Sequence, residues 1–249
     1  MAQSVQHWLI YGDAGAGKTT SATTFPKPAL VFSFEPIGKD TPYISRGMVQ
    51  TGISPEGAMV NQVLNKKDGS LMFQVEYYLD RDPTKPEGYQ RFLKRMTKLE
   101  DDIAANGFQT VVLDSVTFME LTARKLSQYV LNPTSREPRQ WFGFSTDTLE
   151  EILMIRFGSL PINVVALAHI DDQKVTSQGT NVFSIAAPGR LSRCGPGAYS
   201  EVYRAYAMPS PDGVIEYWWQ TRQNGMYTAS TQIGAPDPSP QEYSALWLP

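Results

Sequence analysis

The most constraining feature of this chain is the sequence GDAGAGKT at residues 12–19, which follows directly on an apolar run at residues 7–11. It has the form of a complete phosphate-binding loop, and such a loop works only where a strand ends and a helix begins. The glycines permit the turn, the lysine reaches the β- and γ-phosphates, and the threonine hydroxyl ligates Mg²⁺. We therefore predict that ATP and Mg²⁺ bind here. The predicted nucleotide-binding residues are Gly12, Asp13, Ala14, Gly15, Ala16, Gly17, Lys18, Thr19 and Thr20.

Length and composition favour one domain that spans residues 1–249. With 41% hydrophobic residues the chain can bury a sizeable core. Its 22 basic and 25 acidic residues leave no global basic footprint, so a nucleic-acid contact has to come from a local basic stripe. The single cysteine, Cys194, rules out an internal disulfide. Without an apolar run of membrane length or a secretory start, we expect a cytoplasmic protein that has no membrane partner.

Short apolar runs alternate with helix-like segments, which is typical of a mostly parallel central sheet with helices on both faces. We predict an α/β fold with strands at 7–11, 29–34, 110–114 and 162–168. Helices are expected at 18–24, 88–106, 117–130 and 145–157. The helix at 88–106 has an apolar stripe and ends at Gly107.

The remaining segments are harder to assign. β-type pieces at 202–207, 215–221 and 227–230 indicate an antiparallel C-terminal extension over 205–249. We expect an irregular insertion at 36–86, with one strand at 71–79, and a second irregular segment at 171–197. Loops of that length are uncommon unless they serve a function or are disordered.

Three polar residues follow predicted strands and are candidates for the rest of the site. Asp114 ends the third strand and is suited to hold Mg²⁺ through a water, although an aspartate there is equally a common helix N-cap. Glu35 ends the second strand and is placed to orient the attacking water, or else is a solvated acid. His169 ends the fourth strand, where it can hydrogen-bond the γ-phosphate or serve as an ordinary structural histidine.

The order of GDAGAGKTT, FSFE, TVVLDSVT and VVALAHI resembles the RecA-like ATPase core over residues 5–205. Within that group the chain resembles short phage-encoded P-loop ATPases, some of which act in single-strand annealing or recombination. The resemblance matches Glu35 to the catalytic glutamate of the family and Asp114 with Ser115 to its second motif. The catalytic candidates are Lys18, Glu35, Asp114 and His169. His169 stands where RecA proteins have a glutamine, which is a departure from the pattern, because the charge of a histidine depends on pH.

The resemblance also implies single-stranded DNA as the partner, self-association into a ring or filament, and a single-strand-binding or replication protein as a further partner. Two segments, 132–142 and 171–187, would face the DNA, and their alternative is a solvated surface loop. A trans-acting arginine would come from a neighbouring subunit, although Arg190 is also suited to a surface salt bridge. The DNA-binding candidates are Arg136, Arg139, Trp141 and Lys174, and the trans-arginine candidates are Arg190 and Arg222.

Two other functions stay open. One is a P-loop motor or loader ATPase for packaging or helicase loading, in which segment 36–86 would bind a protein partner. The other is a small-molecule kinase, which we disfavour because no compact arginine-rich lid is visible. Stimulation of ATP turnover by single-stranded DNA, by a protein or by a small acceptor would distinguish the three.

Overall fold

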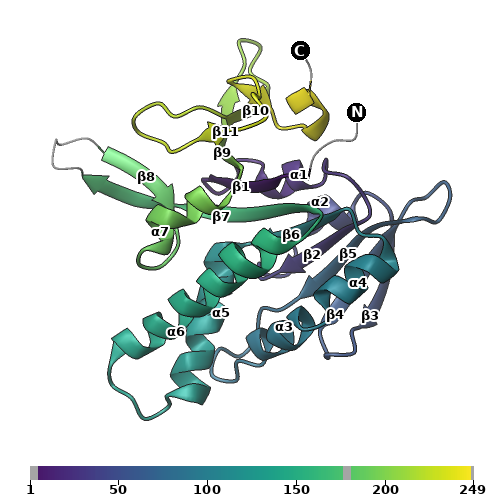
Figure 1. Cartoon of the computed structure of the whole chain (residues 1–249). Coiled ribbons are helices and arrows are strands. Elements are labelled where there is room, and N and C mark those ends of the chain that lie inside the picture. Colours follow the sequence, from purple (N-terminus) through teal and green to yellow (C-terminus); the bar gives the residue numbers. More distant parts are fainter. Residues whose placement is uncertain (1–4, 176–180, 248–249) are drawn as a thin grey trace.

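A computed structural model describes residues 5–175 and 181–247, and one continuous mixed sheet runs through it (Figure 1). Within the described residues the strand order is β12-β10-β9-β1-β7-β6-β2-β5-β4-β3, with β8 paired to β7 and β11 paired to β9. The strands are β1 (His7–Gly12), β2 (Ala29–Ser33), β3 (Met48–Ile53), β4 (Met59–Leu64), β5 (Leu71–Tyr77), β6 (Thr110–Asp114), β7 (Asn163–Val175), β8 (Asn181–Ile185), β9 (Glu201–Pro209), β10 (Ile215–Gln220), β11 (Ser230–Thr231) and β12 (Ser239–Pro240).

The parallel part of the sheet is β9-β1-β7-β6-β2-β5, and antiparallel strands extend it on both sides. The helices are α1 (Lys18–Ala22), α2 (Thr41–Ile44), α3 (Gly88–Met96), α4 (Leu99–Asn106), α5 (Val116–Leu126), α6 (Pro138–Glu150) and α7 (Leu191–Cys194). Wider helical turns continue α5 over Ser127–Leu131 and α6 over Glu151–Arg156. In the described part of the chain, every helix is too short or too polar to cross a membrane.

Alternate residues of the central strands point to opposite faces and so build two cores. In β1, Leu9 and Tyr11 pack with helices α3 to α6, while Trp8 and Ile10 pack with α1, α2 and the C-terminal segment. Both faces are covered, which explains why the central strands read as near-continuous apolar runs. The sequence predicted these strands for that reason.

Segment 36–86 is not the irregular insertion that we expected. It contains α2 and the strands β3, β4 and β5, and β5 pairs in parallel with β2, so this segment completes one side of the main sheet. Only the strand predicted at 71–79 was recognised. β3 was not predicted from the sequence because all six of its residues are exposed, so it lacks the alternation of apolar and polar residues that marks a half-buried strand.

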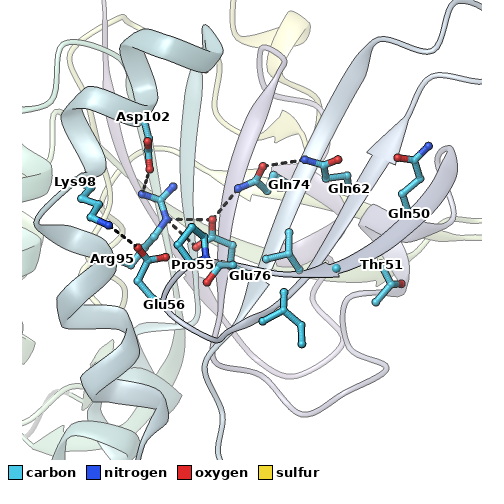
Figure 2. A pocket seen from close by; sticks show the side chains of 14 residues that line it. Gln50, Thr51, Pro55, Glu56, Gln62, Gln74, Glu76, Arg95, Lys98 and Asp102 are labelled. Carbon is cyan, nitrogen blue, oxygen red and sulfur yellow. Dashed lines mark hydrogen bonds and ion pairs between the residues drawn. The ribbon is translucent and has the colours of Figure 1, made fainter.

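The helix expected at 88–106 is two helices, α3 and α4, which meet at Thr97 and Lys98. Beside this break, the buried Arg95 donates hydrogen bonds from Nε to Glu76 at 3.1 Å and forms an ion pair with Asp102 on α4. Arg95, Glu76 and Asp102 are among the side chains that line a polar cavity (Figure 2), whose volume is about 500 Å³. A buried charge has to be paired, which explains the contacts of Arg95. The break between the two helices was not predicted because no glycine or proline marks it in the sequence.

Two other boundaries differ from the prediction. α6 begins at Pro138, not at 145, because proline is favoured in the first helical turn and Ser145 is an interior residue that donates to the Phe142 carbonyl at 3.2 Å. The segment expected to be irregular at 171–197 contains the end of β7, then β8 and α7. The piece predicted at 202–207 belongs to β9, whose first residues pair in parallel with β1 on one side and antiparallel with β11 on the other, while β10 pairs antiparallel with β9 from Arg204 onward.

Candidate nucleotide-binding site

The carboxyl ends of four adjacent parallel strands bring the predicted residues together. β1, β7, β6 and β2 lie side by side. β1 ends at Gly12, β6 ends at Asp114, and β2 ends shortly before Glu35, while His169 pairs with Gly12 inside β7, which continues to Val175. Ligands of open α/β sheets bind at this edge. A cavity of about 830 Å³ opens there, lined by residues 14–21 of the loop and by Glu35, Asp114 and His169.

Two glycines of the loop are required by close approach. A Cβ on Gly12 would lie 2.2 Å from the Ala205 carbonyl oxygen of β9. Gly17 has a φ of +85°, and a Cβ there would lie 2.5 Å from the Gln241 side-chain oxygen and 2.8 Å from the Tyr217 ring. Only glycine adopts that backbone conformation without strain. The loop is therefore held tightly between β9 and the C-terminal segment.

Lys18 is buried at the base of the loop and points back at it. Its Nζ donates to the carbonyl oxygens of Gly12, at 2.9 Å, and Asp13, at 2.8 Å. Burial lowers the pKa of this ammonium, and the nearby carboxylates of Asp114 and Glu35 act in the opposite sense. An ammonium bonded only to carbonyls can exchange them for phosphate oxygens, which carry full negative charge.

Asp114 is a buried carboxylate with polar neighbours. The Tyr43 hydroxyl donates to its Oδ2 at 3.2 Å, and the Thr19 hydroxyl also bonds to it. Burial, followed by repulsion from Glu35, raises the pKa of Asp114 to about 7. Two carboxylates sharing a buried site favour the binding of a cation, which would relieve their repulsion.

Glu35 is also buried, with 9% of its surface exposed. Its Oε1 accepts a hydrogen bond from the Ser115 hydroxyl at 2.6 Å, and Ser115 itself is fully buried. This bond fixes one carboxylate oxygen and leaves the other available to a water in the cavity. Ser115 is thus a residue that orients Glu35.

The donor set fits Mg²⁺. Thr19 and Asp114 supply hydroxyl and carboxylate oxygens, the ligand type that Mg²⁺ prefers, and they sit beside the loop that holds the phosphates. Burial and the nearby Glu35 both disfavour the charged form of Asp114 and so raise its pKa, and a cation bound at this position would counteract them. Thr19 and Asp114 would hold the ion, Asp114 through a water.

His169 lies at the end of the site nearest the β7–β8 hairpin. Its backbone N–H donates to the Thr117 hydroxyl at 3.1 Å, and its carbonyl accepts from the Ala186 N–H at 2.7 Å. Its ring meets Phe118 edge-on. Burial and the charge of Lys18 lower its pKa, so the imidazole is neutral at pH 7 and can donate or accept one hydrogen bond.

Several lining residues were missed by sequence reasoning. Gln241 donates from Nε2 to the carbonyl of Ala16 at 2.8 Å, and Tyr217 lies beside it. An aromatic cluster brings this segment to the loop, since Tyr243 packs on Phe25 with ring centroids 5.0 Å apart. Such aromatic pairs contribute ~1 kcal/mol each beyond their burial. No local motif marks Gln241, because the contact spans most of the chain.

Comparison with known proteins agrees with this geometry. Residues 5–232 match the model of AAA_24, an AAA domain. The chain belongs to the AAA_24 family. It is a P-loop ATPase with a mostly parallel mixed α/β sheet, which confirms the predicted α/β fold and the enzyme class. ATP binding follows from that membership, and P-loop ATPases typically use Mg²⁺.

Solved structures with similar folds come from varied systems. One is a KaiC-like protein of Pyrococcus horikoshii OT3, with 14% identity and a TM-score of 0.43 over 94% of this chain and 84% of that chain. Another is an ATPase from the type III secretion system of pathogenic bacteria, with 13% identity and a TM-score of 0.49 over 84% of this chain and 53% of that chain. A third is the flagellar accessory protein FlaH of Methanocaldococcus jannaschii, with 9% identity and a TM-score of 0.41 over 91% of this chain and 82% of that chain. None of the curated proteins matches the chain.

The remaining predicted residues of this AAA domain lie away from the cavity. Arg136 and Arg139 are exposed near the α5–α6 turn, and Arg139 and Trp141 belong to α6, so half of the predicted loop is helical. Lys174 lies on β7, and its side chain is outside the described residues.

Neither arginine proposed to act in trans lines the cavity. Arg190 forms an ion pair with Glu150 on α6, in which its Nε donates to the carboxylate at 2.7 Å, as in the salt-bridge alternative. Arg222 is exposed, and its carbonyl accepts from Gln220 at 2.7 Å.

We predict that Asp114→Asn stabilises the nucleotide-free AAA domain at pH 8 while removing its activity. The raised pKa of Asp114 means that folding favours its protonated form. The stability due to this carboxyl is therefore full below its ordinary pKa of 3.8 and is lost as pH rises to about 7. At pH 8 the variant should unfold with a free energy roughly 1–3 kcal/mol higher than wild type, and near pH 4 the two should be equal.

Urea unfolding in EDTA at both pH values measures this difference. A variant that is no more stable at pH 8, or that differs equally at both pH values, would show that Asp114 does not carry a buried, unfavourable charge.

Proposed function

We propose that this ATPase hydrolyses ATP through a water oriented by Glu35 and couples turnover to single-stranded DNA. The observation that carries the hydrolytic part is the meeting of Lys18, Thr19, Glu35 and Asp114 around one cavity. The DNA part is supported by exposed arginines beside the α5–α6 turn and by a strand that joins the site to a hairpin.

In this mechanism Lys18 leaves the carbonyls of Gly12 and Asp13 to contact the β- and γ-phosphates. Mg²⁺, when bound at Thr19 and Asp114, would neutralise charge on the phosphate oxygens. Glu35 accepts a proton from the water as its oxygen bonds to the γ-phosphorus, and the bond from that phosphorus to the β–γ bridging oxygen breaks. Ser115 keeps the Glu35 carboxylate turned toward the water.

The coupling route that we propose runs along β7. His169 faces the cavity on the same strand whose far end forms the hairpin with β8, and Ala186, just after β8, bonds to the His169 carbonyl. A shift of His169 on loss of the γ-phosphate would move that hairpin. In Figure 1 the β7–β8 hairpin lies at the upper left, and the α5–α6 turn lies at the bottom of the view.

ATP hydrolysis measured with and without single-stranded DNA, at 50 and 200 mM salt, tests the proposal. DNA should raise the turnover rate, and the effect should weaken at the higher salt because phosphate contacts release counterions. If DNA has no effect at either salt, the DNA part is wrong. Stimulation by a small hydroxyl acceptor with phosphate transfer would instead indicate a kinase.

We predict that the double variant Arg136→Ala with Arg139→Ala binds single-stranded DNA more weakly and with a shallower salt dependence. Each lost phosphate contact should lower the slope of log affinity against log salt by about 1. Fluorescence anisotropy of a labelled oligothymidine measures both quantities. Arg46→Ala with Arg81→Ala, two exposed arginines elsewhere, is the control. An unchanged affinity and slope would remove the α5–α6 turn as a DNA contact.

A protein partner is the second candidate, and one observation favours it. β3 ends the sheet and pairs only with β4 among the described strands, and its Ile53 is 78% exposed. Such an edge invites pairing with another chain. A loader or motor function would show as stimulation of turnover by protein and not by DNA.

A further inference from the structure

The turn that follows Glu35 carries a lysine over the nucleotide cavity. Lys39 lines the cavity together with Lys18, Asp114 and His169, and its side chain is exposed to solvent. Sequence reasoning overlooked it because it lies in segment 36–86, which was expected to be irregular.

The turn is closed by its own hydrogen bonds and is fixed to the sheet through Asp40. The Lys39 N–H donates to the Pro36 carbonyl at 3.1 Å. The next residue, Asp40, is buried, where it accepts from the Gly38 N–H at 3.1 Å and from the Tyr77 hydroxyl on β5. The buried Asp40 therefore anchors the turn to β5 and holds the Lys39 backbone at the cavity rim, while the Lys39 side chain is exposed.

The charge of Lys39 has no partner within residues 5–175 and 181–247. Among the described residues, its ammonium takes part in no ion pair and no side-chain hydrogen bond. Lys39 lies close enough to the site for its charge to lower the pKa of His169. Burial, Lys18 and Glu35 have larger effects on the same pKa. Of the lysines and arginines whose side chains the structure describes, only Lys18 and Lys39 line the cavity.

Phosphoryl transfer needs positive charge at the γ-phosphate beyond that from the loop lysine. The transition state spreads negative charge over the γ-phosphate oxygens, and P-loop NTPases place a cation there, in the same chain or from a neighbour. Arg190 does not meet this need in the described structure because it is paired with Glu150.

We propose that Lys39 is a catalytic cation that contacts the γ-phosphate of ATP bound to its own chain. This inference rests on the proposed hydrolytic function. It adds a residue to the site and assigns to the chain itself the charge that we expected from a neighbouring subunit.

Lys39→Ala is the first test. Turnover should fall at least ~100-fold, as for the loss of one group that stabilises transition-state charge. Affinity for a non-hydrolysable ATP analogue should fall, while affinity for ADP, which lacks the γ-phosphate, should change less than about twofold. Lys39→Arg should restore most of the turnover because it keeps the charge. Lys67→Ala, an exposed lysine on the β4–β5 turn, is the matched control.

Mixing inactive variants tests whether Lys39 acts in its own chain. A Lys18→Ala subunit cannot use its own site but retains Lys39, so it would rescue a Lys39→Ala neighbour if Lys39 acted across subunits. We expect the mixture to show no more turnover than the sum of its parts. Recovered turnover would overturn the in-chain assignment.

The outcomes separate this inference from the proposed function. If wild type hydrolyses no ATP, or Lys18→Ala retains full turnover, the proposed function fails. If both behave as expected but Lys39→Ala turns over like Lys67→Ala, only the role of Lys39 is wrong. Equal losses of ADP and ATP-analogue affinity would show that Lys39 is structural and not a γ-phosphate contact.

Discussion

Replacing Lys18 with alanine is expected to abolish ATP turnover. Lys18 is the only cation at the base of the loop within the described structure, and its Nζ already lies 2.9 Å from the Gly12 carbonyl. Without it the β- and γ-phosphates lose their charge partner both in the bound state and in the transition state. Release of inorganic phosphate at saturating ATP and Mg²⁺ measures the effect.

The controls for this variant address folding. Because Lys18 also bonds to the Asp13 carbonyl, the unfolding curve of the Lys18→Ala variant has to be compared with that of wild type. Lys66→Ala, an exposed lysine on the β4–β5 turn, should keep full turnover. A folded Lys18→Ala variant with normal turnover would contradict the assignment of the phosphate site.

The second large effect is expected from Glu35→Gln, which should retain ATP binding while hydrolysis falls at least ~100-fold. Glutamine has nearly the same shape and can still accept the hydrogen bond that Ser115 donates at 2.6 Å. It cannot take a proton from water. Binding of a fluorescent ATP analogue and single-turnover hydrolysis separate the two steps.

Glu100→Gln, an exposed glutamate in the first turn of α4, is the matched control and should hydrolyse ATP at the wild-type rate. Hydrolysis by Glu35→Gln within a few-fold of wild type would show that another group orients the water.

The parts of the fold that were predictable carry their information locally. The loop at 12–19 combines glycines and a lysine at fixed spacing after an apolar strand, and the central strands are buried on both faces. The rule that parallel strands end at one edge then places Glu35, Asp114 and His169 together before any coordinates are known. Their meeting around one cavity follows from strand order alone.

The parts that were not predictable depend on distant contacts. β3 lacks a buried face. The break between α3 and α4 lies beside Arg95, which forms an ion pair with Glu76 on β5. Gln241 meets Ala16 across most of the chain. Lys39 has no motif, and its role emerges only when Asp40 and Tyr77 fix its turn at the rim of the cavity.

A crystal structure with a non-hydrolysable ATP analogue and Mg²⁺ tests the central claim most directly. The account predicts the triphosphate within the loop at residues 12–19, with Lys18 on the β- and γ-phosphates and Glu35 and Asp114 facing the γ-phosphate. A nucleotide bound elsewhere, for example in the polar cavity beside Arg95, with the loop empty, would contradict it.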